Sequence, residues 1–483
     1  MQKKFLLNLV LLVFLNLLIK SFYILGIDTE VLNRVGAASY GNYFALINFS
    51  FLLNILLDLG ITNFNTKNIA QHNQLLGKYL PSMLSLRMVL SVFYVSVCLI
   101  LGWMWGYSIS QLSLLLLLAF NQSIAGFILY FRSNLTGLQL FKQDSFISVL
   151  DRALLIIFSS VLLWGNLTGG ELKIEWFVYA QTLAYSISAF IAFLILYSKS
   201  GMAPRIKLNW SVPFSLLILK QSFPYALLVI LMMFSYRSDS VMLEKMLDDG
   251  ALQAGVYAQG FRFFEAAYMI PNMFGVLLLP IFSKMIKDKD SIAGLLELSV
   301  KLLLSFAAVL TAVCWFYSYE IMDLRYNDNI ETSANAFSLL MLCFFTISLS
   351  YVFGTLLTAN GNLKYLNILS ASAMFLNIGL NYWLIPDMAA EGSAIASLIT
   401  QSIFALIQIV IVIRMFRLAF NFKLIAGVLL FLGGLIFFGY YSKGFFENVW
   451  LNIASLSIFG VLWAMLTQML SFKAMYQIIK YNK

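Results

Sequence analysis

The chain has few charged residues and very little cysteine or histidine, and each shortage excludes a class of protein. Only 11% of its 483 residues are charged, too few to cover the surface of a soluble globular protein. Cys98, Cys314 and Cys343 each lie alone in an apolar run without CxxC spacing, which indicates small core residues. His72 lies in a polar segment away from any Cys or carboxylate cluster, so neither a metal site nor a histidine-based triad is expected.

Long apolar runs make up most of the chain. Hydrophobic residues account for 61% of it, in runs of about 20 residues, the length that a helix needs to cross the hydrocarbon core. Transmembrane barrels are excluded, because their strands are alternating segments of about 10 residues. We predict an all-α polytopic membrane protein with about 14 transmembrane helices, at roughly 5–25, 40–61, 82–106, 111–131, 146–165, 174–197, 215–237, 252–282, 294–317, 333–356, 365–384, 391–413, 421–441 and 448–470.

The distribution of lysine and arginine predicts the orientation. Every second connection is rich in basic residues, and these connections lie on the same side of the membrane as Lys3 and Lys4. Because basic loops stay in the cytoplasm, both termini are expected there, and the net charge of +9 reflects this bias rather than nucleic-acid binding. The first span lacks a small-x-small cleavage site and is interpreted as a retained helix. The connections are short and contain no GxxxxGK[ST] motif, which excludes an ATP-driven pump.

An internal repeat organises the chain. A shift of 214 residues (255 − 41) aligns Gly41 with Gly255 and Arg87 with Lys301, and a slightly larger shift continues the match. A generic apolar background is the alternative explanation, and the aligned basic residues argue against it. Six spans per repeat give both copies the same orientation, so we expect two lobes related by a pseudo-two-fold axis along the membrane normal. The predicted parts are an N-terminal lobe 1–197, a cytoplasmic linker 198–214, a C-terminal lobe 215–413 and a terminal helix pair 414–483.

Four ionisable residues lie where the seventh and eighth spans meet: Arg237, Asp239, Arg262 and Glu265. A charge at membrane depth is costly and usually faces a partner or a water-filled cavity. The second repeat begins in the same segment, which favours a transporter and not an enzyme.

Several short motifs resemble a known family. They are VGAASYGNY at 35–43, Asp58-Leu59-Gly60, Arg237-Ser238-Asp239 and AGVYA at 254–258. Together with the pattern of spans they resemble the multidrug/oligosaccharidyl-lipid/polysaccharide (MOP) exporter superfamily, in particular the Wzx-type O-antigen and capsule repeat-unit flippases. The resemblance covers the whole chain, although the motifs are short and do not specify a substrate.

This resemblance implies translocation of an undecaprenyl-diphosphate-linked oligosaccharide from the cytoplasmic to the periplasmic leaflet of a bacterial inner membrane. Two lobes would alternate access to a cationic cavity lined by spans 1, 2, 7 and 8, and spans 13 and 14 would border a groove for the lipid tail. The expected partners are the lipid-linked substrate, the bilayer and glycan polymerases. No nucleic acid and no cofactor are expected, the functional form is expected to be a monomer, and coupling to H⁺ or Na⁺ is left open.

Three cations are candidates for binding the diphosphate. Arg262 lies near the middle of the eighth span, Arg237 toward the outer end of the seventh, and Lys20 in the outer half of the first. The alternatives are a local ion pair of Arg262 with Glu265 and a Lys20 side chain that snorkels to the outer interface. Asp239 and Glu265 are candidate counter-ions or coupling groups.

A second group of charges lies near the cytoplasmic ends of spans: Arg87, Lys301, Arg132, Asp151 and Arg152. Paired interface charges are the preferred interpretation, and a cytoplasmic gate is the alternative. Asp58 is expected to close a turn and to pair with a basic residue of the opposite lobe.

Two other functions compete with the flippase. One is a secondary multidrug or small-metabolite exporter of the same superfamily, whose cavity is expected to be more apolar or acidic. The other is a membrane glycan polymerase or ligase, which is expected to carry a large periplasmic loop with Arg or His.

Overall fold

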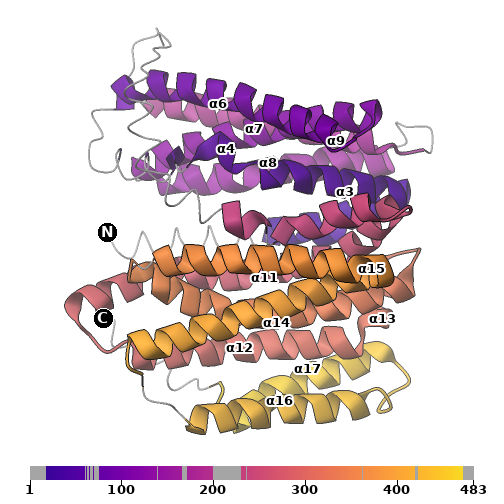
Figure 1. The fold of residues 1–483 in the computed structure, drawn as a ribbon, viewed down its shortest axis with the longest axis vertical. Coiled ribbons are helices and arrows are strands. Elements are labelled where there is room, and N and C mark those ends of the chain that lie inside the picture. Colours follow the sequence, from indigo (N-terminus) through magenta and orange to yellow (C-terminus); the bar gives the residue numbers. More distant parts are fainter. Residues whose placement is uncertain are drawn as a thin grey trace. The chain divides into compact units, whose positions relative to one another are not determined.

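The computed structural model is helical throughout its regular elements in the residues that it describes (Figure 1). These are residues 18–59, 61–62, 65, 69, 76–138, 140–165, 171–199, 230–234, 236–361, 363–418 and 422–470. The chain forms two compact units, Met1–Gly255 and Val256–Lys483. The predicted linker 198–214 lies, apart from residues 198–199, outside the described residues, so it stays a prediction.

Four long helices of the first unit pack side by side: α6 contacts α7, α7 contacts α9, and α9 contacts α8. A further helical stretch at 236–246 belongs to the same unit. The elements of this unit are the π-helix η1 (Tyr23–Asp28) and the α-helices α2 (Thr29–Val35), α3 (Ala37–Leu52), α4 (Ile55–Asp58), α6 (Leu76–Met104), α7 (Ile109–Gly137), α8 (Phe141–Trp164) and α9 (Ile174–Lys199).

The second unit holds the remaining long helices, the first of which starts inside the first unit. They are α11 (Gly250–Asp288), α12 (Ala293–Phe316), α13 (Ser318–Arg325), α14 (Ile330–Ala359), α15 (Leu363–Met415), α16 (Phe422–Ser442) and α17 (Val449–Leu466). Two helices are joined within α15 by a kink at Ala389, three residues after Pro386. The pair α16 and α17 packs on α12, and in Figure 1 it is drawn in yellow.

Ten helices of the described part are long and apolar enough to cross a membrane. They correspond to the third to sixth and the eighth to fourteenth predicted spans, because α15 covers two of these. Most of the first and seventh predicted spans falls outside the described residues. The second predicted span is divided into α3 and α4 by a turn at Leu53 and Asn54.

Two predicted helix ends were wrong in the same way. The first span was expected to end at residue 25, but helical conformation continues to Val35. The seventh was expected to end at 237, but the helix continues to 246. Both extensions carry polar residues that lower the local hydropathy. Asp28 and Asp239 are nevertheless buried, at 0% and 1% exposure, so polarity at these places marks packed interior and not a loop.

Helix α3 and the start of α11 meet backbone to backbone at two glycines. A Cβ atom on Gly41 would lie 1.8 Å from the carbonyl oxygen of Ala251, and one on Gly255 would lie 2.0 Å from that of Ala37. These two glycines are the pair that the repeat shift aligns. The close approach leaves no room for a side chain at either position, so glycine is required sterically.

We therefore expect Gly41→Ala to destabilise the protein by about 1–3 kcal/mol, the usual cost of forcing extra atoms into a packed interface. The measurement is the thermal unfolding midpoint in detergent. Gly379→Ala is the matched control, since a Cβ there meets nothing within 4 Å and replacing a helical glycine by alanine gains about 0.5–1 kcal/mol. Equal midpoints for the two variants would contradict the close approach.

Candidate functional site

Lys20 lies deeper along its helix than the sequence indicated. The helix continues to Val35, so Lys20 is roughly four turns below its end instead of in the outer half of a span that stops at residue 25. Snorkelling of Lys20 to the outer interface stays a prediction. The early predicted end reflected the polar residues Asp28, Thr29 and Glu30, which the hydropathy pattern treats as a loop.

Lys20 lies within electrostatic range of two other cations in the first unit. The charged groups that act on its ammonium are Arg152 and Asp151 of α8 and Arg132 of α7. Lys20, Arg132 and Arg152 are all half-buried. The sequence analysis placed Lys20 in a substrate site and the other three residues in a cytoplasmic group, whereas the structure brings all four together. We name Lys20, Arg132 and Arg152 the cation cluster.

The guanidinium of Arg152 is held by aromatic rings. Its central carbon lies 4.9 Å from the ring centroid of Tyr23 and 5.6 Å from that of Tyr185, and Nη1 donates a hydrogen bond of 2.8 Å to the Tyr185 hydroxyl. Arg152 Nε and Asp151 Oδ2 are 3.8 Å apart, a looser ion pair. The Arg152 side chain keeps 28% of its surface exposed, so this cation is oriented by its neighbours and still accessible.

Arg132 has a closer carboxylate partner. Its Nε lies 2.7 Å from Oδ1 of Asp144, and Nη2 lies 3.5 Å from Oδ2. Asp144 is buried, and Arg132 keeps 23% of its side chain exposed. Arg132 is thus paired, as the sequence analysis preferred. Its partner Asp144 is a residue that the sequence analysis did not name.

Arg237 also lies deeper than expected, because its helix continues for about two and a half turns beyond it. Its Nη1 donates to Asn48 Oδ1 of α3 at 2.9 Å, and its guanidinium lies 4.9 Å from the ring centroid of Phe51. Asp239, two residues on, is buried. Asp239 therefore lies in the packed interior of the first unit, Arg237 is half-buried against α3, and neither lies at a helix end.

Arg262 and Glu265 form a local ion pair on α11 in the second unit. The distance between Nη1 and Oε2 is 2.7 Å, and Arg262 is 8% exposed. This is the i,i+3 pair that the sequence analysis considered as the alternative to cavity lining.

The partner of Asp58 differs from the expectation. Asp58 pairs with Arg87 of α6, in the same unit, and not with a residue of the opposite lobe. Arg87 is 2% exposed and donates further hydrogen bonds to Gly126 O at 2.9 Å and to Thr62 Oγ1 at 2.8 Å. The sequence did not show that α4 packs against α6. Lys301, the repeat equivalent of Arg87, pairs instead with Glu297 one turn away at 2.7 Å.

Some functional candidates were missed. Asp28 and Asn48 are buried polar residues beside Arg152 and Arg237, and the rule that singled out Asp239 would have found Asp28 had the first span been drawn longer. A buried cluster on both sides of the α15 kink was missed as well, although its spacing of four residues was a visible signal. It links Asn377, Asn381, Ser393 and Ser397 by hydrogen bonds of 2.8–3.4 Å.

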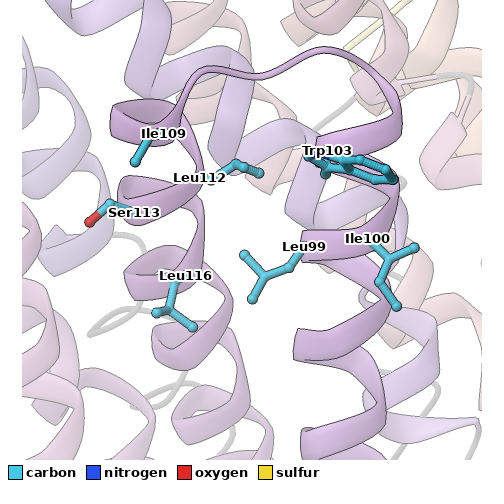
Figure 2. A pocket seen from close by; sticks show the side chains of 7 residues that line it. All are labelled: Leu99, Ile100, Trp103, Ile109, Leu112, Ser113 and Leu116. Carbon is cyan, nitrogen blue, oxygen red and sulfur yellow. The ribbon is translucent and has the colours of Figure 1, made fainter.

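Two pockets in the described part are apolar and are lined by none of these charged residues. Figure 2 shows a cavity of about 530 Å³ between α6 and α7, lined by Leu99, Ile100, Trp103, Ile109, Leu112, Ser113 and Leu116. Another of about 380 Å³ lies among α12, α14 and α16. Linings of this kind suit hydrocarbon chains and offer little to a charged group. Within the described residues, no cluster of three or more His, Cys, Asp or Glu is arranged for a metal ion.

We expect Asp58→Asn to lower the thermal unfolding midpoint strongly, since it leaves the Arg87 guanidinium buried without its carboxylate, a loss of about 3–5 kcal/mol. Glu297→Gln is the matched control, because its pair with Lys301 is partly exposed and such pairs contribute about 0–1 kcal/mol. Unfolding of both variants in detergent, followed by fluorescence, checks this. A shift as small for Asp58→Asn as for Glu297→Gln would show that the buried pair is dispensable.

Solved structures of several transporters share the fold. The lipid II flippase MurJ in an inward closed conformation matches with a TM-score of 0.71 at 16% identity, over 95% of this chain and 97% of MurJ. A multidrug resistance MATE family transporter of the MOP superfamily in an inward-facing conformation matches at 0.60 and 14%, over 82% and 94%. A MOP superfamily transporter from Pyrococcus furiosus matches at 0.59 and 14%, over 85% and 96%. At these identities the likeness establishes the helical fold alone.

Sequence comparison gives the family. None of the curated proteins matches the chain. The family model described as polysaccharide biosynthesis protein matches residues 31–286, more than half of the chain. The matched residues include α7, α8 and the helix of Arg237, which carry Arg132, Asp144, Asp151, Arg152, Arg237 and Asp239. The chain therefore belongs to the polysaccharide biosynthesis protein family.

Proposed function

We propose that this protein moves undecaprenyl-diphosphate-linked oligosaccharides from the cytoplasmic to the periplasmic leaflet of a bacterial inner membrane. The observation that carries the proposal is the partly exposed Arg152 guanidinium, which the rings of Tyr23 and Tyr185 hold in place and which lies within electrostatic range of Lys20 in the first unit. Asp144 and Asp151 compensate two of the three cations, which leaves an excess of positive charge that is costly in a membrane. An anionic ligand would balance this excess.

The cation cluster suits a diphosphate chemically. A diphosphate must exchange its water for charge-assisted hydrogen bonds before it can enter a membrane. A guanidinium carries five N–H groups in a rigid fork that fits phosphate oxygens, and Arg152 gives one hydrogen bond to a described side chain, Tyr185. The Lys20 ammonium adds a compact charge beside it. Arg237, which hydrogen-bonds Asn48, and Arg262, which hydrogen-bonds Glu265, remain further candidates for contact with the substrate.

The family and the fold support transport of a glycolipid. The family is named for polysaccharide biosynthesis, and a solved structure with the same fold is a lipid II flippase. We infer transport without catalysis, by alternating access of two lobes, with both termini in the cytoplasm and the monomer as the functional form. Asp239 and Glu265 remain our candidates for coupling to H⁺ or Na⁺, and glycan polymerases remain the expected protein partners.

We expect the purified protein in proteoliposomes to flip a fluorescent undecaprenyl-diphosphate oligosaccharide, and Lys20→Ala or Arg152→Ala to slow this at least about tenfold. A hydrogen bond to a charged group contributes about 1.5–3 kcal/mol, and about 1.4 kcal/mol corresponds to a factor of ten. Smaller losses are expected for Arg237→Ala and Arg262→Ala, because each of these arginines already satisfies a neighbour. The initial rate of flipping, at matched insertion, is the quantity to compare.

Arg34→Ala is the control, since Arg34 forms an exposed pair with Glu30 on the helical segment that carries Lys20. It should flip at the normal rate. Normal flipping by the Lys20 and Arg152 variants would keep the flippase and reject the cation cluster as its site. Efflux of an organic cation by the intact protein, without glycolipid flipping, would support the multidrug exporter instead.

A further inference from the structure

One turn of the first helix departs from α-helical geometry beside the cation cluster. Residues Tyr23–Asp28 form the π-helix η1, between α-helical residues on both sides. In an α-helix, side chains five residues apart point about 140° away from each other around the axis. The i→i+5 bonding of a π-helix brings them onto one face. The wider turn therefore places Tyr23 and Asp28 together, and π-helical turns of this kind are frequent at functional sites.

Asp28 is the buried end of a hydrogen-bonded chain. Its side chain is 0% exposed, its Oδ1 accepts a hydrogen bond from the Tyr23 hydroxyl at 3.4 Å, and its Oδ2 accepts one from the Tyr40 hydroxyl at 2.5 Å. Tyr40 lies in α3 and is fully buried. Asp28 thus fixes the Tyr23 hydroxyl to a part of the unit that cannot easily move.

The other end of this chain is Arg152. The centroid of the Tyr23 ring lies 4.9 Å from the central carbon of the guanidinium. Tyr185 supplies a second ring, and its hydroxyl accepts a hydrogen bond from Nη1. A phenol that donates a hydrogen bond to a carboxylate gains some negative charge on its ring. This charge strengthens the attraction of the ring for a cation. Asp28 therefore acts on Arg152 through Tyr23.

We propose that Asp28 and Tyr23 are positioning residues that hold the plane of the Arg152 guanidinium for phosphate. This rests on the proposed function. A long arginine side chain must lose its rotational freedom when it binds a ligand, and a guanidinium that is already oriented loses less. Tyr40 anchors Asp28, Asp28 anchors Tyr23, and Tyr23 with Tyr185 sets the direction in which the free N–H edge of Arg152 points.

The first test uses Tyr23→Phe, which keeps the ring and removes the hydroxyl, and Asp28→Asn, which keeps the shape and removes the charge. Both should raise the apparent KM for the lipid-linked oligosaccharide about three- to tenfold and leave the maximal flipping rate nearly unchanged. In an Arg152→Ala background, Tyr23→Phe should add nothing further, because its effect passes through Arg152. Additive losses would overturn the proposal.

Tyr94→Phe is the matched control. Tyr94 is another fully buried tyrosine of this unit, and its hydroxyl donates to the carbonyl oxygen of Ser50 at 2.9 Å. Its loss should lower the thermal unfolding midpoint but leave the apparent KM alone. An increase of KM in Tyr94→Phe equal to that in Tyr23→Phe would mean that any loosening of the unit has the same effect, and would reject a positioning role.

The second test reads the position of Arg152 without any substrate. The rate at which phenylglyoxal modifies Arg152, measured by peptide mass spectrometry, should rise several-fold in Tyr23→Phe and Asp28→Asn and stay normal in Tyr94→Phe. Unchanged modification in all three variants would overturn the inference. If the intact protein does not flip the glycolipid, the proposed function fails, while the modification rates still decide whether Asp28 and Tyr23 hold Arg152.

Discussion

The low polarity of the bilayer sets the rule that the rest of this structure follows: a charge at membrane depth has to be held by a partner. The first unit meets this demand in different ways. Arg87 and Asp58 form a closed pair, and Arg87 also satisfies a backbone carbonyl and Thr62. Arg152 is held mainly by tyrosine rings and one hydroxyl. A closed pair stabilises the unit and has little left for a ligand, whereas a cation held by rings keeps most of its N–H groups for one.

The same rule explains why helices continue through polar segments. A helix in hydrocarbon satisfies its own backbone groups, so it can run on wherever its polar side chains find partners inside the unit. Asp28 finds two tyrosine hydroxyls, and Arg237 finds Asn48. Gly41 and Gly255 bring α3 and α11 close together in this region. Polar residues and glycines therefore act together here, since close backbone packing shields the polar groups from lipid.

Hydropathy was sufficient to predict the class of fold and eleven of the spans, which the long helices of the described residues match. The reason is that the length of an apolar run follows directly from the thickness of the bilayer. They failed where tertiary partners decide the outcome. The ends at residues 25 and 237 were drawn too early, because a hydropathy pattern cannot distinguish a buried aspartate from one in a loop. The partner of Asp58 depended on how α4 packs against α6. The π-helical turn at Tyr23–Asp28 left no mark in the periodicity, and with it the link between Asp28 and Arg152 was missed.

Burial separates the cation cluster from the other charges that the sequence singled out. Asp28 and Asp144, two of the carboxylates around the cluster, are buried, whereas Lys20, Arg132 and Arg152 all keep part of their surface exposed. Asp151, which lies beside Arg152, is the partly exposed carboxylate of this group, at 21% of its side chain. Arg262 presents its charge together with that of Glu265, three residues away. The pair of Arg152 with Asp151, at 3.8 Å, is looser than that of Arg262 with Glu265, at 2.7 Å, so the first unit is the better candidate for the proposed anion site.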